Sequence, residues 1–139
     1  MKKVFIVEDE ALVALELKDH LRMMGYGVCG HAARGEAALR QIPEACPDLV
    51  LMDINLGDGM TGLDVAERLR GVYDVPVIFL TAYTDAELTE RAGRSQSFAY
   101  IVKPFEPRVL RANIELALVR NDAPIALRES EAFNIAVLD

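Results

Sequence analysis

The sequence predicts an α/β domain in which helices cover both faces of a doubly wound, five-stranded parallel sheet with strand order 2-1-3-4-5. Short, uninterrupted apolar runs rich in β-branched residues recur along the chain, as is typical of strands buried on both faces of a parallel sheet. Segments with helical spacing separate these runs, and such alternation favours right-handed crossovers and a three-layer sandwich. A chain of 139 residues is long enough for one domain with a proper core and too short for two.

The predicted strands follow the apolar runs in order. Three runs are strong, namely Val4–Val7, Leu49–Met52 and Val75–Leu80. Two weaker runs, Val28–Ala32 and Phe98–Val102, suit the two edges of the sheet, where burial is less complete. Five strands fit the 2-1-3-4-5 order better than the longer six-stranded alternative.

The predicted helices are marked by their spacing and by their ends. Apolar residues of the first helix repeat at three and four, and Gly25 follows them as a C-terminal stop. These apolar positions are Ala14, Leu17 and Leu21. Thr84 and Glu87 fit a capping box that opens a fourth helix. Pro107 is favourable just inside the start of a fifth helix, which runs to about Arg120.

Residues 1–120 are predicted to form the domain, and residues 121–139 a C-terminal linker or tail. The helical pattern ends after Arg120, where Asn121–Pro124 reads as a break. The segment beyond it is polar in its middle and apolar towards Asp139. Two interpretations stay open: a frayed extension of the domain, and a connector that leads to a further module.

Composition and charge exclude several classes of protein. Hydrophobic residues make up 52% of the chain and charged residues 27%, the balance of an ordinary globular protein. The apolar runs are far shorter than the ~20 residues that a membrane span needs. No signal-peptide pattern opens the chain, so we expect a cytoplasmic protein with no membrane partner. The net charge is −7, which repels nucleic acid and argues against direct nucleic-acid binding.

The cysteines and histidines show no metal-binding pattern. Cys29 and Cys46 form no CxxC pair, so both are interpreted as small core residues rather than as a bridge or a zinc site. His20 and His31 have no ligand-like spacing to each other or to the cysteines. Neither histidine is given a functional role.

Chemically useful side chains follow four of the five predicted strands. Glu8 and Asp9 end the first strand, Asp53 the third, Thr81 the fourth and Lys103 the fifth. The carboxyl ends of parallel strands meet at one edge of the sheet, where ligands bind in open α/β folds. Each residue taken alone has a simple structural interpretation as a turn former, a helix cap or a surface residue. Their joint placement predicts a site.

The residue types at this site indicate a magnesium-dependent phosphoryl acceptor. Three carboxylates held together repel one another, and Lys103 supplies only one compensating charge. A hard divalent cation with oxygen ligands is the natural complement, and Mg²⁺ typically takes one or two carboxylates together with a phosphate. With this charge neutralised, Asp53 can act as a nucleophile that forms an acyl phosphate. Catalysis then consists of positioning and charge neutralisation.

Four segments resemble the receiver domains of two-component response regulators, a family with a flavodoxin-like fold. They are Val4–Asp9, Leu49–Asp53, Pro76–Ala82 and Tyr100–Phe105. They cover residues 1 to about 120 in the order and spacing of the family. The resemblance implies a phosphoacceptor in a phosphorelay, with a histidine kinase or phosphotransfer protein as donor and an output domain or protein downstream. It also allows a weak homodimer.

The resemblance implies a role for each matching residue around the metal. Asp53 becomes the phosphoacceptor, Asp9 a direct Mg²⁺ ligand, and Glu8 an acidic partner that acts through water. The backbone carbonyl of Asn55 becomes a further ligand. Many members of the family have paired aspartates after the first strand, so Glu8 is a departure that keeps the charge but is longer by one methylene.

The resemblance also implies a switch. Thr81 and Lys103 bind the phosphoryl group, Tyr100 changes rotamer with Thr81, and a cis bond before Pro104 aims the lysine. The face formed by the fourth helix, the fifth strand and the fifth helix then changes. Many DNA-binding members carry an acidic pair just before the switch tyrosine. This chain has Ser97–Ala99 there, which argues against their salt-bridged dimer.

Two residues are predicted to set the lifetime of the phosphoryl group. Asn55 and Tyr83 lie two positions after Asp53 and Thr81, where their side chains flank the path of an attacking water. A ring at Tyr83 excludes water, whereas Asn55 can orient one. The alternative is that Tyr83 points into solvent.

Two other functions fit the fold less well. A hydrolase of the haloacid-dehalogenase type needs an acid–base Asp two positions after the nucleophile, and Asn55 cannot transfer that proton. A nucleotide- or flavin-binding module needs a phosphate-binding loop after the first strand, and the chain has neither GxxxxGK[ST] nor GxGxxG there. The residues Leu127–Glu131 look like the connectors that precede sensor or kinase modules, which keeps open that the chain is the first piece of a larger protein.

Overall fold

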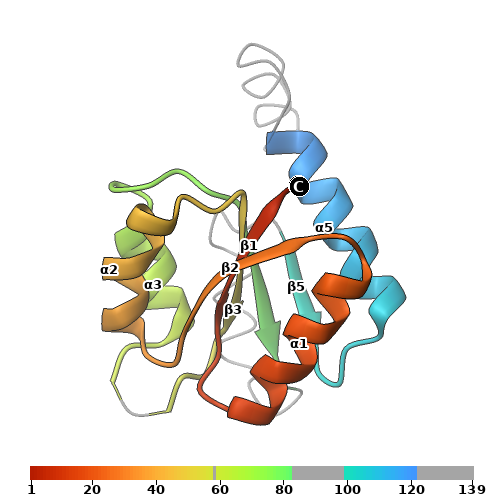
Figure 1. The fold of residues 1–139 in the computed structure, drawn as a ribbon. Helices are drawn as coiled ribbons and strands as arrows, with labels where there is room; N and C mark the ends of the chain where they lie inside the picture. Colours follow the sequence, from red (N-terminus) through yellow and green to blue (C-terminus); the bar gives the residue numbers. More distant parts are fainter. Residues whose placement is uncertain (58, 83–98, 122–139) are drawn as a thin grey trace, which may run out of the picture.

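The computed structural model describes residues 1–57, 59–82 and 99–121. A five-stranded parallel sheet lies between two helical layers (Figure 1). The strands are β1 (Lys3–Val7), β2 (Gly27–Ala32), β3 (Leu49–Asp53), β4 (Val77–Thr81) and β5 (Ala99–Val102). The described helices are α1 (Ala11–Met23), α2 (Gly35–Ala45), α3 (Gly62–Leu69) and α5 (Pro107–Asn121). The strand order is β2-β1-β3-β4-β5, which confirms the predicted topology.

The sheet separates two hydrophobic clusters because successive side chains of a strand point to opposite faces. On β1, Phe5 and Val7 pack against α2 and α3, whereas Val4 and Ile6 pack against α1 and α5. All four side chains are fully buried. In Figure 1, α2 and α3 cover one face of the sheet and α1 and α5 the other. This burial on both faces explains why the central strands read as continuous apolar runs.

The helix ends agree with the sequence where the structure describes them. Helix α1 buries the three predicted apolar positions, and Gly25 follows it with a φ of +90°, a conformation that favours glycine. Helix α5 begins at Pro107 as predicted. The capping box expected at Thr84 and Glu87 lies outside the described residues. A capping box that the sequence analysis missed opens α3, where Thr61 and Asp64 exchange side-chain and backbone hydrogen bonds.

The register between β1 and β2 contains one irregularity. Val4 pairs with Val28, but the next residue, Phe5, pairs with Gly30, so Cys29 is an extra residue in β2. Such a bulge re-aims the side chains that follow it. Gly30 makes the bulge possible, because a Cβ atom there would lie 2.5 Å from the Phe5 ring.

Two cysteine predictions have different outcomes. Both thiols are free, and Cys29 is half-buried against the α2–α3 side of the core. Cys46 is exposed, with a φ of 49° after the end of α2, so its interpretation as a core residue was wrong. Residue type alone does not reveal that Cys46 is exposed and has a left-handed backbone conformation.

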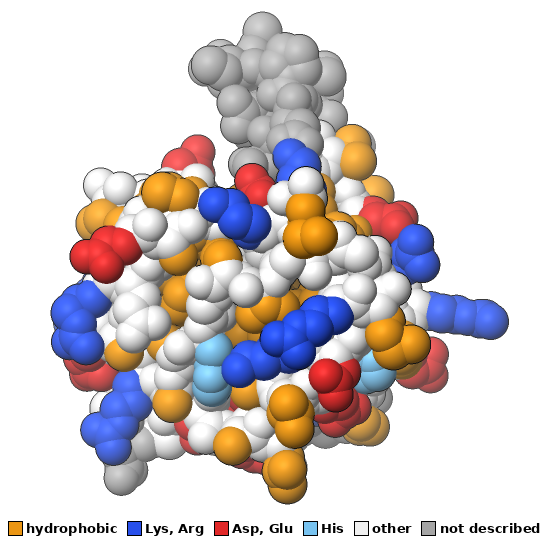
Figure 2. Space-filling view, viewed as in Figure 1, with side chains coloured by type: hydrophobic (Ala, Val, Ile, Leu, Met, Phe, Trp, Pro, Cys, Tyr) orange, Lys and Arg blue, Asp and Glu red, His pale blue; other side chains and the backbone are white. Residues whose placement is uncertain are grey.

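The surface agrees with the mixed charges of the sequence. On the face shown in Figure 2, basic and acidic side chains are interspersed rather than gathered into a patch of one sign. Helix α5 has a second apolar side: Leu110, Ile114 and Leu118 are buried, while Leu116 and Val119 are exposed. Within the described part of the chain, no helix combines the length and the apolar character that crossing a bilayer requires.

Candidate functional site

Buried polar side chains lie at the carboxyl ends of the central strands, next to the apolar core of the sheet. Glu8 follows β1, Asp53 ends β3 and Thr81 ends β4, and these are the buried polar or charged side chains among the described residues. Glu8 is 0% exposed and Asp53 4%. Burying an ionised carboxylate is costly unless it is paired. The two carboxylates therefore need a positively charged partner in this position.

Lys103 lies between two of the buried carboxylates. It follows β5 directly, and its backbone N–H donates to the carbonyl oxygen of Thr81 at 2.6 Å. Its Nζ atom donates to Glu8 Oε1 at 2.9 Å and to Asp53 Oδ2 at 3.0 Å. The bond between Lys103 and Pro104 is cis, as the family resemblance implied. One ammonium that follows β5 thus bridges two carboxylates at the ends of β1 and β3.

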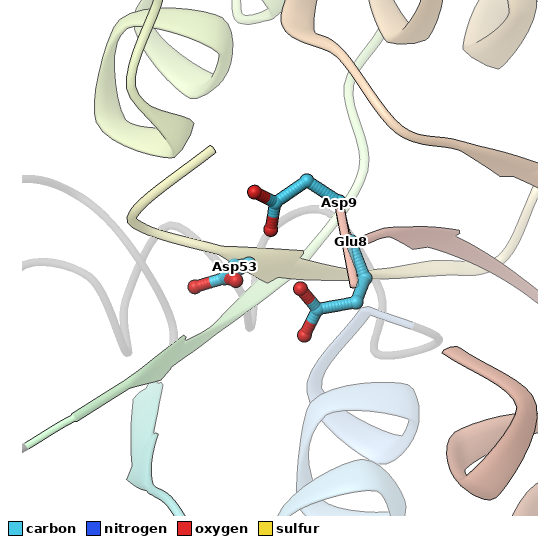
Figure 3. A group of neighbouring side chains, drawn as sticks. All are labelled: Glu8, Asp9 and Asp53. Carbon is cyan, nitrogen blue, oxygen red and sulfur yellow. The ribbon is translucent and has the colours of Figure 1, made fainter. Parts of the chain in front are cut away.

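A third carboxylate joins this group from the residue next to Glu8. Asp9, Glu8 and Asp53 each offer an oxygen atom, and these oxygens all lie within 4.8 Å of one another. Figure 3 shows the three carboxylates gathered in one space between the ends of β1 and β3. Three negative charges beside one ammonium leave a deficit of two positive charges when all are ionised. An all-oxygen donor set with that deficit fits a hard divalent cation such as Mg²⁺.

The electrostatics of the site reflect this excess of negative charge. Burial raises the pKa of Glu8, and the neighbouring Asp53 carboxylate raises it further, against the opposing effect of Lys103. The pKa of Asp9 is raised by its partial burial and then by Glu8. Burial lowers the pKa of Lys103, but its hydrogen bonds and charge interactions with Glu8 and Asp53 outweigh that effect, so its pKa is raised overall. Without a metal, the raised pKa values of Glu8 and Asp9 favour proton uptake by these two carboxylates.

The backbone around Asp53 is fixed by the loop that follows it. The N–H of Asn55 donates to Asp53 Oδ1 at 3.1 Å, and Asn55 Oδ1 in turn accepts from the N–H of Gly57 at 3.0 Å. Gly62, the first residue of α3, lies so close to the Asp53 carbonyl that an added Cβ atom would overlap it. The N–H of Gly62 donates to the Ile54 carbonyl at 2.8 Å. The nucleophile candidate therefore sits on a rigid, glycine-supported backbone.

The structure brings together most of the residues that the sequence singled out. Thr81 is buried at the end of β4, and its Oγ1 donates to the Ala82 carbonyl at 3.2 Å. Tyr100 lies on β5 opposite Phe79, and only its backbone is described. Tyr83 lies outside the described residues. Gly62 and His31 were missed, and His31 contacts the Glu8 backbone at the rim of the site.

Comparison with known proteins identifies the class. The family model described as "Response regulator receiver domain" matches residues 4–115, so the chain belongs to that family. It is a receiver domain of the kind used in two-component signalling, rather than a classical enzyme. Receiver domains generally bind Mg²⁺ in an acidic pocket, and the cluster of Glu8, Asp9 and Asp53 has that character.

Individual relatives show how far the match extends. The transcriptional regulatory protein PdtaR of Mycobacterium tuberculosis is 38% identical over 119 residues, which are 86% of this chain and 58% of that protein. The phyllosphere-induced regulator PhyR of Methylorubrum extorquens is 38% identical over 84% of this chain and 43% of its own length. The signal receiver domain of a modulated diguanylate cyclase from Desulfovibrio desulfuricans has a TM-score of 0.81 at 37% identity, covering 87% of this chain and 96% of that one. The chain spans about half the length of the curated relatives that it matches.

Proposed function

We propose that this receiver domain accepts a phosphoryl group on Asp53 from a histidine kinase or phosphotransfer protein, with the help of Mg²⁺. One observation carries the proposal: the ammonium of Lys103 lies 3.0 Å from Asp53 Oδ2 and 2.9 Å from Glu8 Oε1, inside a cluster of three carboxylates. A site that is completed by a metal ion and a phosphoryl group accounts for this imbalance.

The chemistry requires a carboxylate oxygen that can attack phosphorus. A carboxylate oxygen of Asp53 forms the new bond to phosphorus while the bond from phosphorus to the donor's histidine nitrogen breaks, and the leaving imidazole takes up a proton. Asn55 N–H holds Oδ1 and Lys103 holds Oδ2, so both oxygens have fixed positions. Lys103 can then neutralise charge on the transferred group. Asp53 is therefore assigned as the phosphoacceptor, with Lys103 and Thr81 as phosphoryl-binding residues.

The metal would be held by the acidic cluster. Asp9 and Asp53, with the backbone carbonyl of Asn55, would be direct ligands, and Glu8 would act through water. Bound Mg²⁺ supplies charge neutralisation for the carboxylates and for the phosphoryl oxygens. Asp53 ends β3, Asp9 lies two residues after β1, and Asn55 belongs to a turn closed by its hydrogen bond with Gly57. Protein movement on binding should therefore be small at these residues.

Signal output is assigned to the side of the domain that contains β5. Phosphorylation would draw Thr81 towards the phosphoryl group and let Tyr100 pack behind it, which would change the face formed by β5 and α5; the fourth helix expected in that face lies outside the described residues. The exposed apolar residues Leu116 and Val119 on α5 extend this surface. Amide exchange with and without a phosphoryl mimic should change at β5 and α5. Changes confined to α1 and α2 would contradict this assignment.

The phosphoacceptor itself is tested by intact-mass measurement. Acetyl phosphate with Mg²⁺ should add one phosphoryl group to the wild type and none to Asp53→Asn. Asp48→Asn is a matched control, because Asp48 precedes the opposite end of the same strand and binds the Lys3 backbone N–H. It should be modified like the wild type. Equal phosphate uptake by wild type and Asp53→Asn would overturn the assignment.

The lifetime of the phosphoryl group is assigned to Asn55 and Tyr83. Asn55 is exposed and its Oδ1 accepts from Gly57, which limits how freely it can orient an attacking water. We expect Tyr83→Ala to shorten the lifetime of phospho-Asp53 more than Asn55→Ala does, because excluding water matters more than orienting it. Dephosphorylation rates with saturating Mg²⁺ measure this. An unchanged or longer lifetime for Tyr83→Ala would rule out shielding by the ring.

The boundary of the domain belongs to the same proposal. Residues 1–120 would form the receiver, and residues 121–139 a linker or tail that passes the signal to a further module. Support comes from a similar solved structure, the N-terminal domain of a response regulator/sensory box/GGDEF three-domain protein from Carboxydothermus hydrogenoformans, with a TM-score of 0.77 and 35% identity. A chain ending at Arg120 should take up phosphate as fast as the full 139 residues. Slower uptake would make the tail part of the receiver.

A further inference from the structure

We infer that His31, at the end of the edge strand β2, is a positioning residue for the acidic metal site; the inference rests on the proposed function. Its Nε2 atom lies 2.9 Å from the backbone carbonyl oxygen of Glu8. A carbonyl oxygen can only accept a hydrogen bond, so Nε2 carries the hydrogen and donates it. The ring is half-buried rather than free in solvent.

This hydrogen bond acts on two carboxylates at once. The carbonyl of Glu8 belongs to the peptide unit that joins Glu8 to Asp9, and that unit is planar and rigid. A hydrogen bond to its oxygen therefore restricts rotation of this peptide unit, and with it the directions in which the Glu8 and Asp9 side chains project. The N–H of Glu8 is also held by β2, because it donates to the Ala32 carbonyl at 3.0 Å. Strand β2 thus forms hydrogen bonds with both the N–H and the carbonyl oxygen of Glu8.

The bulge in β2 is what aims His31 at this carbonyl. Val28 packs on the α1 side of the sheet with Val4, and Cys29 on the α2 side. A Cβ at Gly30 would meet the Phe5 ring, which also belongs to the α2 side. Two successive residues therefore share one face, and the alternation is shifted by one position.

The shift pairs His31 with Ile6, whose side chain points to the α1 side. In a regular strand His31 would pair with Val7 and point to the opposite side, towards α2 and α3. The bulge thus turns the imidazole towards the side of the sheet on which the chain leaves β1 for α1. Strand β2 contributes none of the site residues predicted from the sequence, but its His31 orients two of the carboxylates.

The test compares a variant that keeps the donor with one that removes it. In His31→Gln the side-chain amide can donate to the same carbonyl, whereas His31→Leu has a similar bulk and no donor. Magnesium affinity of the metal-free protein, measured by titration calorimetry, should weaken about fivefold in His31→Leu, the effect of one lost hydrogen bond, and stay within about twofold of wild type in His31→Gln. His20→Leu is the matched control, because His20 is a half-buried histidine on α1 paired with Glu16, away from the site.

A second readout does not involve the metal. The amide nitrogen of Asp9 belongs to the peptide unit whose carbonyl His31 holds, so its chemical shift in the metal-free protein should move in His31→Leu and return towards wild type in His31→Gln. A general loss of stability would change the chemical shifts of all amides in the edge strand. In that case His31→Gln would not restore the Asp9 shift selectively. Equal affinity and equal Asp9 shifts in wild type and His31→Leu would overturn the inference.

The outcomes separate this inference from the proposed function. Asp9→Asn serves as the reference for a broken metal site. If wild type and Asp9→Asn bind Mg²⁺ equally, the metal site is wrong, and the role of His31 falls with it. If Asp9→Asn alone loses affinity while His31→Leu binds as wild type does, the metal site stands and only the role of His31 is refuted.

Discussion

The two ends of the β-sheet use polar groups in opposite ways. At the amino end, Asp48 accepts from the Lys3 backbone N–H at 2.7 Å, and the Tyr73 hydroxyl donates to the Pro47 carbonyl at 2.8 Å. Each of these side chains forms a hydrogen bond with a backbone group of another segment. At the carboxyl end, three carboxylates share one ammonium.

The amino end thus has polar groups that are paired within the protein, whereas the carboxyl end has negative charges in excess. Neutral or singly charged hydrogen bonds to the backbone each contribute on the order of 1 kcal/mol and need no ligand. A cluster with excess negative charge costs free energy until a cation or a proton arrives. Substitutions at the amino end should therefore weaken the fold and leave the chemistry alone. Substitutions at the carboxyl end should change both, and the sign of the stability change should depend on which charge is removed.

The largest effect is expected from Gly62, the glycine that begins α3, with Gly71, just beyond the end of α3, as the control. Gly62→Ala should destabilise the protein by about 3 kcal/mol, because the new methyl group overlaps the Asp53 carbonyl and the backbone must shift. Gly71→Ala meets nothing within 4 Å and should be neutral or slightly stabilising. Urea unfolding of both variants measures this. Comparable losses at the two positions would show that the contact with Asp53 is not what requires glycine.

Removing the shared ammonium should have the next largest effect. Lys103→Met should cost about 2 kcal/mol at neutral pH, less than a fully buried broken ion pair would, because Glu8 can take up a proton. The loss should shrink as the pH is lowered, since a protonated Glu8 no longer needs the ammonium. Urea unfolding of metal-free protein at neutral and acidic pH tests this. A loss of the same size at both pH values would contradict the explanation.

At the amino end, Tyr73→Phe should cost on the order of 1 kcal/mol, because the Pro47 carbonyl loses its donor while the ring stays packed against the core. Mg²⁺ affinity and phosphate uptake should be unchanged, since Tyr73 lies at the other end of the sheet. Thermal unfolding and calorimetric titration measure the two quantities. A variant with weakened Mg²⁺ binding would show that the two ends are not independent.

The smallest effect has the opposite sign. The pKa values of Asp9 and Glu8 are raised above 3.8 and 4.5 in the fold, so their contribution to the stability of the metal-free protein is greatest below these values and is lost as the pH rises through the folded-state values. Asp9→Asn removes one repelling charge. It should stabilise the metal-free protein at neutral pH by less than about 1 kcal/mol, because Asp9 is exposed and screened.

Magnesium provides the check on that prediction. Excess Mg²⁺ should stabilise the wild type, because it binds the folded state, and should not stabilise Asp9→Asn. Unfolding curves in chelator give the stability of each metal-free protein, and curves in excess Mg²⁺ give the additional stabilisation by the metal. A variant that is less stable than wild type in chelator would show that Asp9 is not repelled by its neighbours.

The sequence predicted the topology and the gathering of three carboxylates and one lysine at one edge of the sheet, because both follow from strand ends. Glu8, Asp53 and Lys103 each stand directly after or at the end of an apolar run, and parallel strands carry such ends to one edge. Continuous apolar runs also predicted burial on both faces of the sheet, which the side chains of β1 confirm.

The remaining features depend on contacts between distant segments, which no local pattern contains. The bulge at Cys29 and the direction of the His31 side chain depend on the register of β2 against β1. In the sequence alone, His31 looks like an ordinary strand residue. The need for glycine at position 62 depends on the approach of α3 to the end of β3. Only the capping box of Thr61 and Asp64 left a local signal, because a threonine followed three residues later by an acidic residue marks a helix start.

The separation of the core into two clusters has a consequence for how such a domain can diverge. Among the described buried residues, those facing α1 and α5 form one cluster and those facing α2 and α3 another, with the sheet backbone between them. A change of residue volume on one side is therefore met by repacking on that side alone. Descendants of the domain can therefore remodel the surface of α5 while α3 and the loop that follows Asp53 keep their geometry.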